Sequence, residues 1–353
     1  MRFGPVPVED APGAISAHTI RAGEVVVKKG SIIAEETALR LKQAGIQTVI
    51  AARLDPGDVG EDEAAFRLAE ALAGENVAVE RPFTGRSNLY AKRTGLLVVN
   101  KGIVDRVNAV DEAITAATLP MYRPVVGGEM VGTVKIIPYA TARPILDQAL
   151  ALTGVQGKAL WVAPYVRRQI AVVSTLLPGL KPSVVTKTLN VMQKRLDPAG
   201  GKIIAERRVP HETEALWCEL AGLATSDAEL IVIFGASAIS DRNDVIPVAI
   251  EQAGGLVERL GMPVDPGNLL LTGSLCGKPV IGAPDCARSP KENGFDWVLQ
   301  RFLADVPITH TDIAALGVGG LLVEIVSRPQ PRAGGERIEK EIWSEGGASE
   351  DEA

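Results

Sequence analysis

The chain has 353 residues, 46% of them hydrophobic and 23% charged, and this length favours two domains rather than one. Its 37 basic and 43 acidic residues give a net charge of −6 at pH 7, which argues against a broad nucleic-acid-binding surface. The 3 cysteines are too few and too scattered for a disulfide framework. Since no apolar run reaches the roughly 20 residues of a membrane span, we expect a cytoplasmic globular protein with no membrane partner.

Residues 1–165 have irregular patterning that predicts an α+β or partly β amino-terminal domain. Residues 22–50 predict a strand, a short helix that ends at Gly45, and another strand, and residues 55–74 predict a loop and a second helix. Further strands separated by Gly- and Pro-containing turns are expected at 87–99, 112–119 and 128–138.

The second part of the chain has the alternation typical of a parallel α/β sheet. From about Ile170, short β-branched runs alternate with helix-period segments. We predict an α/β domain over residues 166–326, with a doubly wound, mostly parallel sheet and a boundary near Pro164 to Arg168. Its strands are expected in the runs QIAVVST, KIIAERRV, AELIVIF, NLLLTG and KPVIGAP. Residues 327–353, rich in Gly and Glu, predict a disordered acidic tail.

Three helix starts are readable in this second part. Ser183 is expected to cap one helix, and Asp244 another, with Pro247 in its first turn. Residues 289–292 (SPKE) have the pattern of a capping box with proline at the first helical position.

Four loops should meet at the carboxyl edge of such a sheet, where open α/β sheets bind ligands. Helix N-termini in these loops offer free N–H groups and a partial positive charge, so we expect an anion such as a phosphate. Gly235, Ala236 and Ser237 are small enough to let the backbone approach a ligand. The four loops are Ser174 to Pro182, Gly235 to Asp244, Val264 to Asn268 and Gly282 to Ser289.

Structural roles for the same residues stay open. Ser237, Asp241 and Asp244 are equally typical of turns and caps. Because aspartates repel phosphate, the two aspartates fit better as caps, as acceptors for a polar ring, or as ligands of a Mg²⁺ ion that bridges to phosphate. His211 is expected to be a local cap or surface residue rather than a catalytic base, and Cys286 a small buried thiol. Neither a dinucleotide-binding glycine motif, nor a Walker-type loop, nor a nucleophile-elbow triad is present.

The loop sequences, in this order, resemble the molybdopterin-binding domain of molybdenum cofactor biosynthesis proteins. In that family a strand ends in Thr/Ser-Gly-Gly, followed by Ser-x-Gly-Asp-x-Asp and a helix. The run FGASAISDRND is similar, with Gly235-Ala236 at the glycine pair, Ser237 at the serine, and Asp241 and Asp244 near the aspartates after a one-residue insertion.

Two further family landmarks follow. The family's Met-Lys-Pro-Gly-Lys-Pro is similar to VDPGNL, which keeps Pro266 and Gly267 but has Asp265 and Asn268 in place of the lysines. The family's Gly-Lys-Pro-Val-Phe-Gly-Leu-Pro-Gly-Asn-Pro is similar to GKPVIGAPDCA, which keeps Gly282 and Pro284 and has Asp285, Cys286 and Ala287 where Gly-Asn-Pro is expected.

The resemblance covers residues 166–305 and implies binding of molybdopterin or its nucleotide form, with possible catalysis of molybdenum insertion. It also implies a homo-oligomer, assistance by Mg²⁺ at the phosphate, and a molybdoenzyme or cofactor nucleotidyltransferase as partner. Asp241 and Asp244 are the candidate catalytic residues, and no metal ligands are assigned. The candidate binding residues are Ser174, Thr175, Gly235, Ala236, Ser237, Asp241, Pro266, Gly267, Gly282, Pro284, Asp285 and Ser289.

Two other functions are compatible with the same domain. In the molybdenum insertases the lysines of the second landmark belong to the site, so their replacement favours a non-enzymatic carrier or sensor of the cofactor. Nucleotide-processing relatives that share the domain, such as the competence-damage-inducible proteins, are the third possibility.

Overall fold

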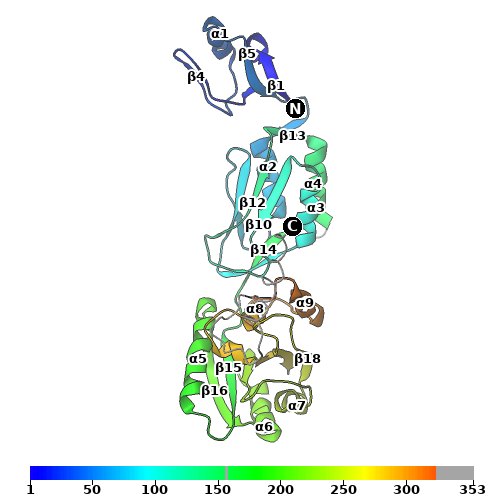
Figure 1. Ribbon diagram of the computed structural model, residues 1–353. Coiled ribbons are helices and arrows are strands. Elements are labelled where there is room, and N and C mark those ends of the chain that lie inside the picture. Colours follow the sequence, from blue (N-terminus) through cyan, green and yellow to red (C-terminus); the bar gives the residue numbers. More distant parts are fainter. Residues whose placement is uncertain (156–157, 323–353) are drawn as a thin grey trace, which may run out of the picture.

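A computed structural model describes residues 1–155 and 158–322 of the chain. Figure 1 shows three parts arranged in a line: an amino-terminal module at the top, a middle part, and the carboxy-terminal α/β part at the bottom. The predicted acidic tail, residues 327–353, lies outside the described residues.

The amino-terminal module is a small sheet with one helix. β1 pairs antiparallel with β5, which also pairs with β2, while β3 and β4 form a separate hairpin. The predicted strand, short helix and strand are confirmed; α1 ends at Gln43, and Gly45 has a left-handed φ of 85°. Its elements are β1 Arg2–Pro7, η1 Val8–Asp10, β2 Ile15–Ser16, β3 Ile20–Ala22, β4 Val25–Val27, α1 Glu35–Gln43 and β5 Thr48–Arg53.

The middle part packs three helices against antiparallel strands in the orders β10-β12-β8-β7, β11-β9-β14 and β13-β6. The predicted helix at 55–74 and the three strand regions are confirmed, but α3 and α4 were not predicted. The hydrophobic core of this part is separate from that of the amino-terminal module. Its elements are β6 Asp58–Gly60, α2 Glu61–Leu72, β7 Val77–Val79, β8 Arg86–Ala91, β9 Gly95–Val99, α3 Lys101–Asn108, β10 Ile114–Thr118, β11 Pro124–Val125, β12 Met130–Ile136, β13 Ala140–Ala142, α4 Arg143–Val155 and β14 Leu160–Pro164.

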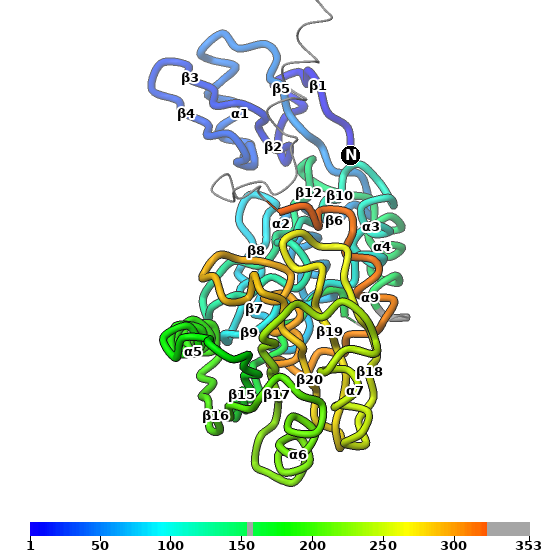
Figure 2. The backbone as a smooth tube through the Cα atoms, turned by 60° about the horizontal axis from the view of Figure 1, so that its bottom comes forward, coloured from blue at the N-terminus to red at the C-terminus, as the bar shows by residue number. Residues whose placement is uncertain are grey.

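The carboxy-terminal part contains a six-stranded sheet in the order β16-β15-β17-β20-β19-β18, and the labels of these strands follow one another in this order from left to right in Figure 2. The first four strands are parallel, β19 runs antiparallel to β20, and β18 runs antiparallel to β19 and hence parallel to the first four. The predicted mostly parallel α/β sheet is therefore confirmed. Its elements are β15 Gln169–Leu176, α5 Pro182–Leu196, η2 Asp197–Ala199, β16 Lys202–Pro210, α6 Thr213–Ala224, β17 Leu230–Phe234, α7 Val245–Gln252, β18 Leu256–Leu260, β19 Leu271–Leu275, β20 Lys278–Ala283, η3 Asp285–Arg288, α8 Gly294–Leu303, α9 His310–Ala314 and η4 Ala315–Gly317.

Alternating side chains of the central strands enter two separate cores. In β15, Ile170 and Val172 pack with α5 and α8, whereas Ala171 and Val173 pack with α6 and α7. The chain leaves β15 toward β16 and then returns to β17 on the other side of β15. The order of the strands therefore reverses between β15 and β17, and such a reversal opens a crevice at the carboxyl ends of the two strands.

Two of the three predicted helix starts differ from the structure. Asp244 caps α7 as predicted, because its carboxylate accepts the N–H of Val245 at 2.7 Å. Ser183 does not cap α5, which begins at Pro182 after Lys181. The SPKE run does not begin a helix: α8 begins at Gly294, where a capping box joins residues 293 and 296.

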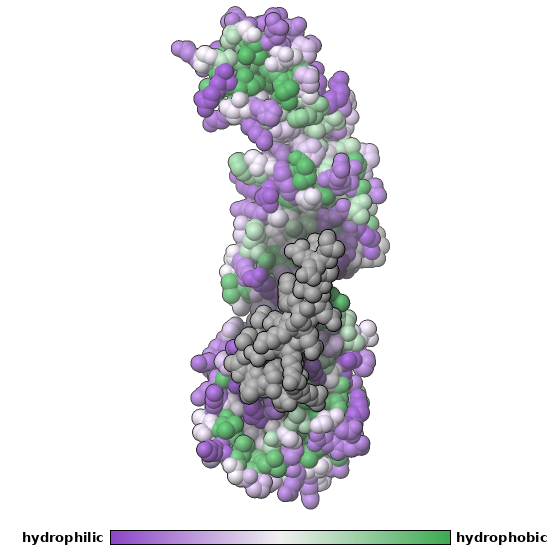
Figure 3. Space-filling model, viewed as in Figure 1, coloured by the Kyte–Doolittle hydropathy of each residue, from purple (hydrophilic) through white to green (hydrophobic). Residues whose placement is uncertain are grey.

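The surface mixes hydrophilic and hydrophobic side chains on the face shown in Figure 3. In the amino-terminal module large hydrophobic side chains are exposed at Phe3, Val26, Ile32 and Leu39. Within residues 1–155 and 158–322, no helix is both long enough and apolar enough to cross a bilayer.

Candidate functional site

The loops after β17 and β20 are held together by Arg288. Its guanidinium donates to the carbonyl of Gly235 at 2.6 Å and to Oγ1 of Thr188 at 3.1 Å. It also lies over the ring of Phe234, 5.3 Å from the ring centroid. Two of the four predicted loops, 235–244 and 282–289, are thus in direct contact at the carboxyl edge of the sheet.

Thr175, His211 and Ser237 form a hydrogen-bonded group where the strand order reverses. Oγ1 of Thr175 lies 2.8 Å from Nδ1 of His211, and Nε2 of the same ring lies 3.2 Å from Oγ of Ser237. The N–H of Ala236 donates to Oγ1 of Thr175 at 2.8 Å. Thr175 is buried and Ser237 is exposed, so the group extends from the sheet edge to the surface.

The hydrogen-bond partners of Thr175 assign the tautomer of His211. Oγ1 of Thr175 already accepts the N–H of Ala236, and a buried hydroxyl needs an acceptor for its own proton. Nδ1 of His211 is that acceptor, so the proton of the neutral ring is on Nε2, which donates to Ser237. In this tautomer Nε2 of His211 donates to Ser237, which leaves the proton of the Ser237 hydroxyl for a ligand.

His211 was not predicted as part of the site. The sequence analysis placed it at a local cap or on the surface, because it is one residue before an expected helix. The structure shows that it directly follows β16, at the carboxyl end of a parallel strand. The sequence could have indicated this role, because the carboxyl ends of parallel strands lie at the same edge of the sheet. A residue directly after a predicted strand is therefore a candidate for the site.

A cavity of about 360 Å³ lies at the end of β20, and Arg288 is among the residues that line it. Pro266, Asp285 and Ser289, from two predicted loops, line it together with Lys187 of α5 and Lys291. Within the described residues neither lysine makes an ion pair, whereas Asp285 lies 3.6 Å from Nε of Arg288. The two free ammonium groups make this cavity suitable for an anionic group.

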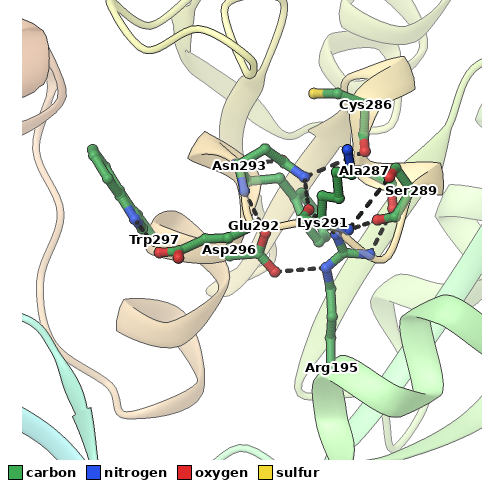
Figure 4. Close-up of polar contacts among 10 residues, drawn as sticks. Arg195, Cys286, Ala287, Ser289, Lys291, Glu292, Asn293, Asp296 and Trp297 are labelled. Atoms are coloured by element: carbon green, nitrogen blue, oxygen red, sulfur yellow. Dashed lines mark hydrogen bonds and ion pairs between the residues drawn. The ribbon is translucent and has the colours of Figure 1, made fainter. Parts of the chain in front are cut away.

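Arg195 of α5 shapes the loop around this cavity. Figure 4 shows its guanidinium beneath the loop, where it donates to the carbonyls of Ala287 and Ser289, both at 2.7 Å. Nε of Arg195 also contacts Asp296 at 2.6 Å, and the arginine side chain is only 8% exposed. The loop conformation thus depends on a buried side chain that is 92 or more residues away in the sequence.

The predicted glycines are required by packing within the protein. A Cβ at Gly235 would lie 2.5 Å from the carbonyl oxygen of Ser237, and one at Gly282 would lie 2.6 Å from Ile239. Gly267 has a φ of 142° and lies against the backbone of another glycine. Other residues of the chain occupy the space beside each of these glycines. Glycine is therefore required here by the packing of the protein, and not by the approach of a ligand.

Asp241 and Asp244 have partners within their own loop. Oδ1 of Asp241 accepts the backbone N–H of Asn243 at 2.8 Å and its side-chain amide at 2.7 Å, and the backbone hydrogen bond holds the pKa of Asp241 below its ordinary 3.8. Asp244 accepts from Val245 and from the N–H of Ser240. Among residues 1–155 and 158–322, no three His, Cys, Asp or Glu side chains are grouped closely enough to hold a metal ion.

The remaining candidate residues differ in their surroundings. Ser174 is 2% exposed, and its hydroxyl has no hydrogen-bond partner. Because it is adjacent to Thr175 in β15, its side chain faces the α5 and α8 side of the sheet rather than the side of His211. Pro284 is buried directly before η3. The structure thus brings Thr175, Ala236 and Ser237 together but separates Ser174 from them by the sheet.

Comparison with known proteins gives a family match over part of the chain and a weak likeness to a solved structure. A family described as a domain of unknown function (DUF8806) matches residues 5–53, and no curated protein matches the chain. Among solved structures, the chain is similar to the crystal structure of the molybdopterin biosynthesis MoeA protein from Pyrococcus horikosii. The sequence identity is 15% and the TM-score 0.29, over 86% of this chain and 75% of that chain. Function is therefore inferred below from the chain's own residues.

Proposed function

We propose that the carboxy-terminal part of this protein binds molybdopterin or its nucleotide form at the carboxyl edge of its sheet. Two observations support this most: the group Thr175, His211 and Ser237 at the strand reversal, and a cavity at the end of β20 whose lining contains lysines without an ion pair to any described residue. The order of the three loop motifs, which resembles the molybdopterin-binding domain, specifies the ligand.

Each end of this edge suits a different part of the ligand. The free hydroxyl of Ser237 can donate to an acceptor on a ring. Lys187 and Lys291 can bind a phosphate, because ammonium groups form charge-assisted hydrogen bonds to phosphate oxygens. Arg288 is committed to Gly235 and Thr188 and therefore positions the two loops rather than the ligand.

Mg²⁺ does not fit the residues present at this edge. The carboxylates of Asp241 and Asp244 accept hydrogen bonds from their own loop, and each therefore stabilises the backbone around Ser237. A Mg²⁺ site requires near-octahedral oxygen ligands, for which carboxylates must be available. We therefore assign these aspartates to loop shape and include no metal-dependent step.

A carrier is favoured over an insertase by two observations. The positions of the insertase lysines hold Asp265 and Asn268, both exposed, so neither can bind an oxyanion as a cation would. In addition, His211 has the tautomer of a hydrogen-bond donor rather than a base for Ser237. The site can bind a ligand through hydrogen-bond donors, but these residues do not form a general acid–base pair for catalysis.

The test is an anaerobic titration of the full-length protein with molybdopterin and adenylylated molybdopterin, with and without molybdate. Ser237→Ala should weaken binding about tenfold, since a hydrogen bond in a binding site contributes about 1–1.5 kcal/mol. Ser240→Ala, in the same exposed loop, is the matched control. Lys187→Ala should weaken binding by a similar factor, while Lys194→Ala, on the same helix, should leave it unchanged.

The outcomes separate the possible functions. Binding without products identifies a carrier, whereas release of AMP with capture of molybdenum identifies an insertase. Failure of both pterins to bind would refute the proposed ligand. Binding that is equally strong in Ser237→Ala and Ser240→Ala would refute the proposed site.

A further inference from the structure

A second, larger cavity lies between the middle part and the carboxy-terminal part. Its volume is about 890 Å³, in the range of sites for drug-sized molecules. One wall is residues 120–124, from the β10–β11 connection and the first residue of β11. The other consists of residues from α8, α9 and η4 and from the loops beside them, including Pro290 and Glu292. Figure 1 shows α8 and α9 at the end of the carboxy-terminal part that faces the middle part.

A buried donor without a partner lines this cavity. Arg301 is 4% exposed, and its Nε has no hydrogen-bond partner. The other end of the guanidinium donates to the carbonyl of Pro307 and lies 3.4 Å from Asp312. Unpartnered buried donors are rare in proteins because each carries a desolvation penalty. Nε is therefore the position at which a ligand acceptor would relieve that penalty.

Aromatic rings occupy both walls. The guanidinium carbon of Arg301 lies 4.2 Å from the centroid of the Tyr122 ring, and Tyr122 has a left-handed φ of 61°, which is uncommon for a bulky residue. Nε1 of Trp297 donates to Glu292 at 3.0 Å, so its ring is held in one orientation. Figure 4 shows this ring directed away from the loop that Arg195 holds. Two rings and a guanidinium make a suitable surface for a planar group.

The charges of the cavity disfavour an anion. Its acidic side chains are Glu292, Asp296 and Asp312, and its basic side chains are Arg123 and Arg301. Acidic groups therefore outnumber basic ones, in contrast to the smaller cavity with its free lysines. A phosphate-bearing ligand would be repelled here, whereas a neutral ring with a hydrogen-bond acceptor would not.

We propose that this cavity is a second binding site, for an uncharged planar heteroaromatic group such as the base of a nucleoside. The base stacks on Tyr122 or Trp297 and presents a ring nitrogen or carbonyl to Nε of Arg301. Since Nε is buried, binding includes a displacement of side chains around it. The two cavities share Pro290 and Glu292 in their linings, but this proposal does not rest on the proposed molybdopterin site.

The experiment is a calorimetric titration of the full-length protein with adenosine, guanosine and AMP. At least one nucleoside should bind, and AMP should bind more weakly than adenosine. Tyr122→Asn removes the ring while keeping a residue that tolerates left-handed backbone. This variant and Trp297→Phe should each weaken nucleoside binding, Tyr122→Asn by about tenfold because it loses a stacking contact. Trp217→Phe is the matched control, since Trp217 is 37% exposed on α6 and lines neither cavity.

Three results would overturn the proposal. The first is no binding by either nucleoside to a protein whose thermal unfolding shows it to be folded. The second is binding that is unchanged in both Tyr122→Asn and Trp297→Phe. The third is tighter binding of AMP than of adenosine, which would contradict the charge argument. Ser237→Ala should leave nucleoside binding unchanged, so failure of the molybdopterin proposal does not affect this test.

Discussion

Replacing Arg195 by alanine should destabilise the carboxy-terminal part strongly and loosen the loop around the smaller cavity. The arginine donates to the carbonyls of Ala287 and Ser289, pairs with Asp296 at 2.6 Å, and lies over the ring of Phe295. Arg195→Ala leaves these carbonyls without their donor and removes the charge partner of Asp296.

The size of the effect follows from burial. The two side chains of the ion pair are 8% and 18% exposed, and removing one partner of a buried pair costs about 3–5 kcal/mol. Water can reach part of the loop and replace some of the lost donors, so we expect a decrease in the free energy of unfolding of about 3–4 kcal/mol. That is a large share of the roughly 5–15 kcal/mol that stabilises a typical domain.

Urea denaturation monitored by tryptophan fluorescence measures this change, because Trp217 and Trp297 report on the carboxy-terminal part. The matched control is Arg208→Ala, which breaks a pair in which the side chains are 39% and 35% exposed and should cost less than about 1 kcal/mol. Equal decreases in the free energy of unfolding of the two variants would refute the reasoning. They would mean that water replaces the hydrogen bonds from Arg195 to the loop carbonyls in full.

Four further predictions concern the carboxyl edge of the sheet. Gly235→Ala should lower the free energy of unfolding by about 1–3 kcal/mol, because its Cβ would lie 2.5 Å from a backbone oxygen. Gly222→Ala, in α6 with open space around it, should raise that free energy by up to about 1 kcal/mol; urea denaturation of both variants checks the opposite signs. Thr175→Val should cost about 1–3 kcal/mol by leaving the part-buried N–H of Ala236 without its acceptor, and an unchanged urea midpoint would contradict this. Asp241→Asn should retain pterin binding, whereas Asp241→Ala should lose it, because the oxygen rather than the charge holds the turn; equal losses in titrations of both variants would show that the charge itself is needed. Since the backbone N–H of Asn243 lowers the pKa of Asp241 below 3.8, the contribution of Asp241 to stability is complete at neutral pH and is lost as the pH falls through the lowered pKa. The NMR shift of the Asn243 amide in an acid titration checks this, and a transition above pH 3.8 would contradict it.

The local pattern of residues was sufficient to predict most of the elements. Within the run AELIVIF, the five residues of β17 (LIVIF) are all apolar because the strand is buried on both faces of the sheet, so no tertiary information was needed to recognise it. Asp244 caps α7 through the N–H of the next residue, and Pro247 lies in the first turn of that helix. Such features depend on neighbours in the sequence, which is why they could be read from it.

The structure alone decided where these elements meet and which local signals were overruled. The SPKE run has a helix-start pattern, but its backbone carbonyls are taken by Arg195 from another helix, and the helix begins later. His211 became part of the candidate site through contacts 36 and 26 residues away in the sequence, with Thr175 and Ser237. Composition and periodicity specify which segments are helices and strands, whereas the register of the strands and long-range hydrogen bonds determine which side chains face each other.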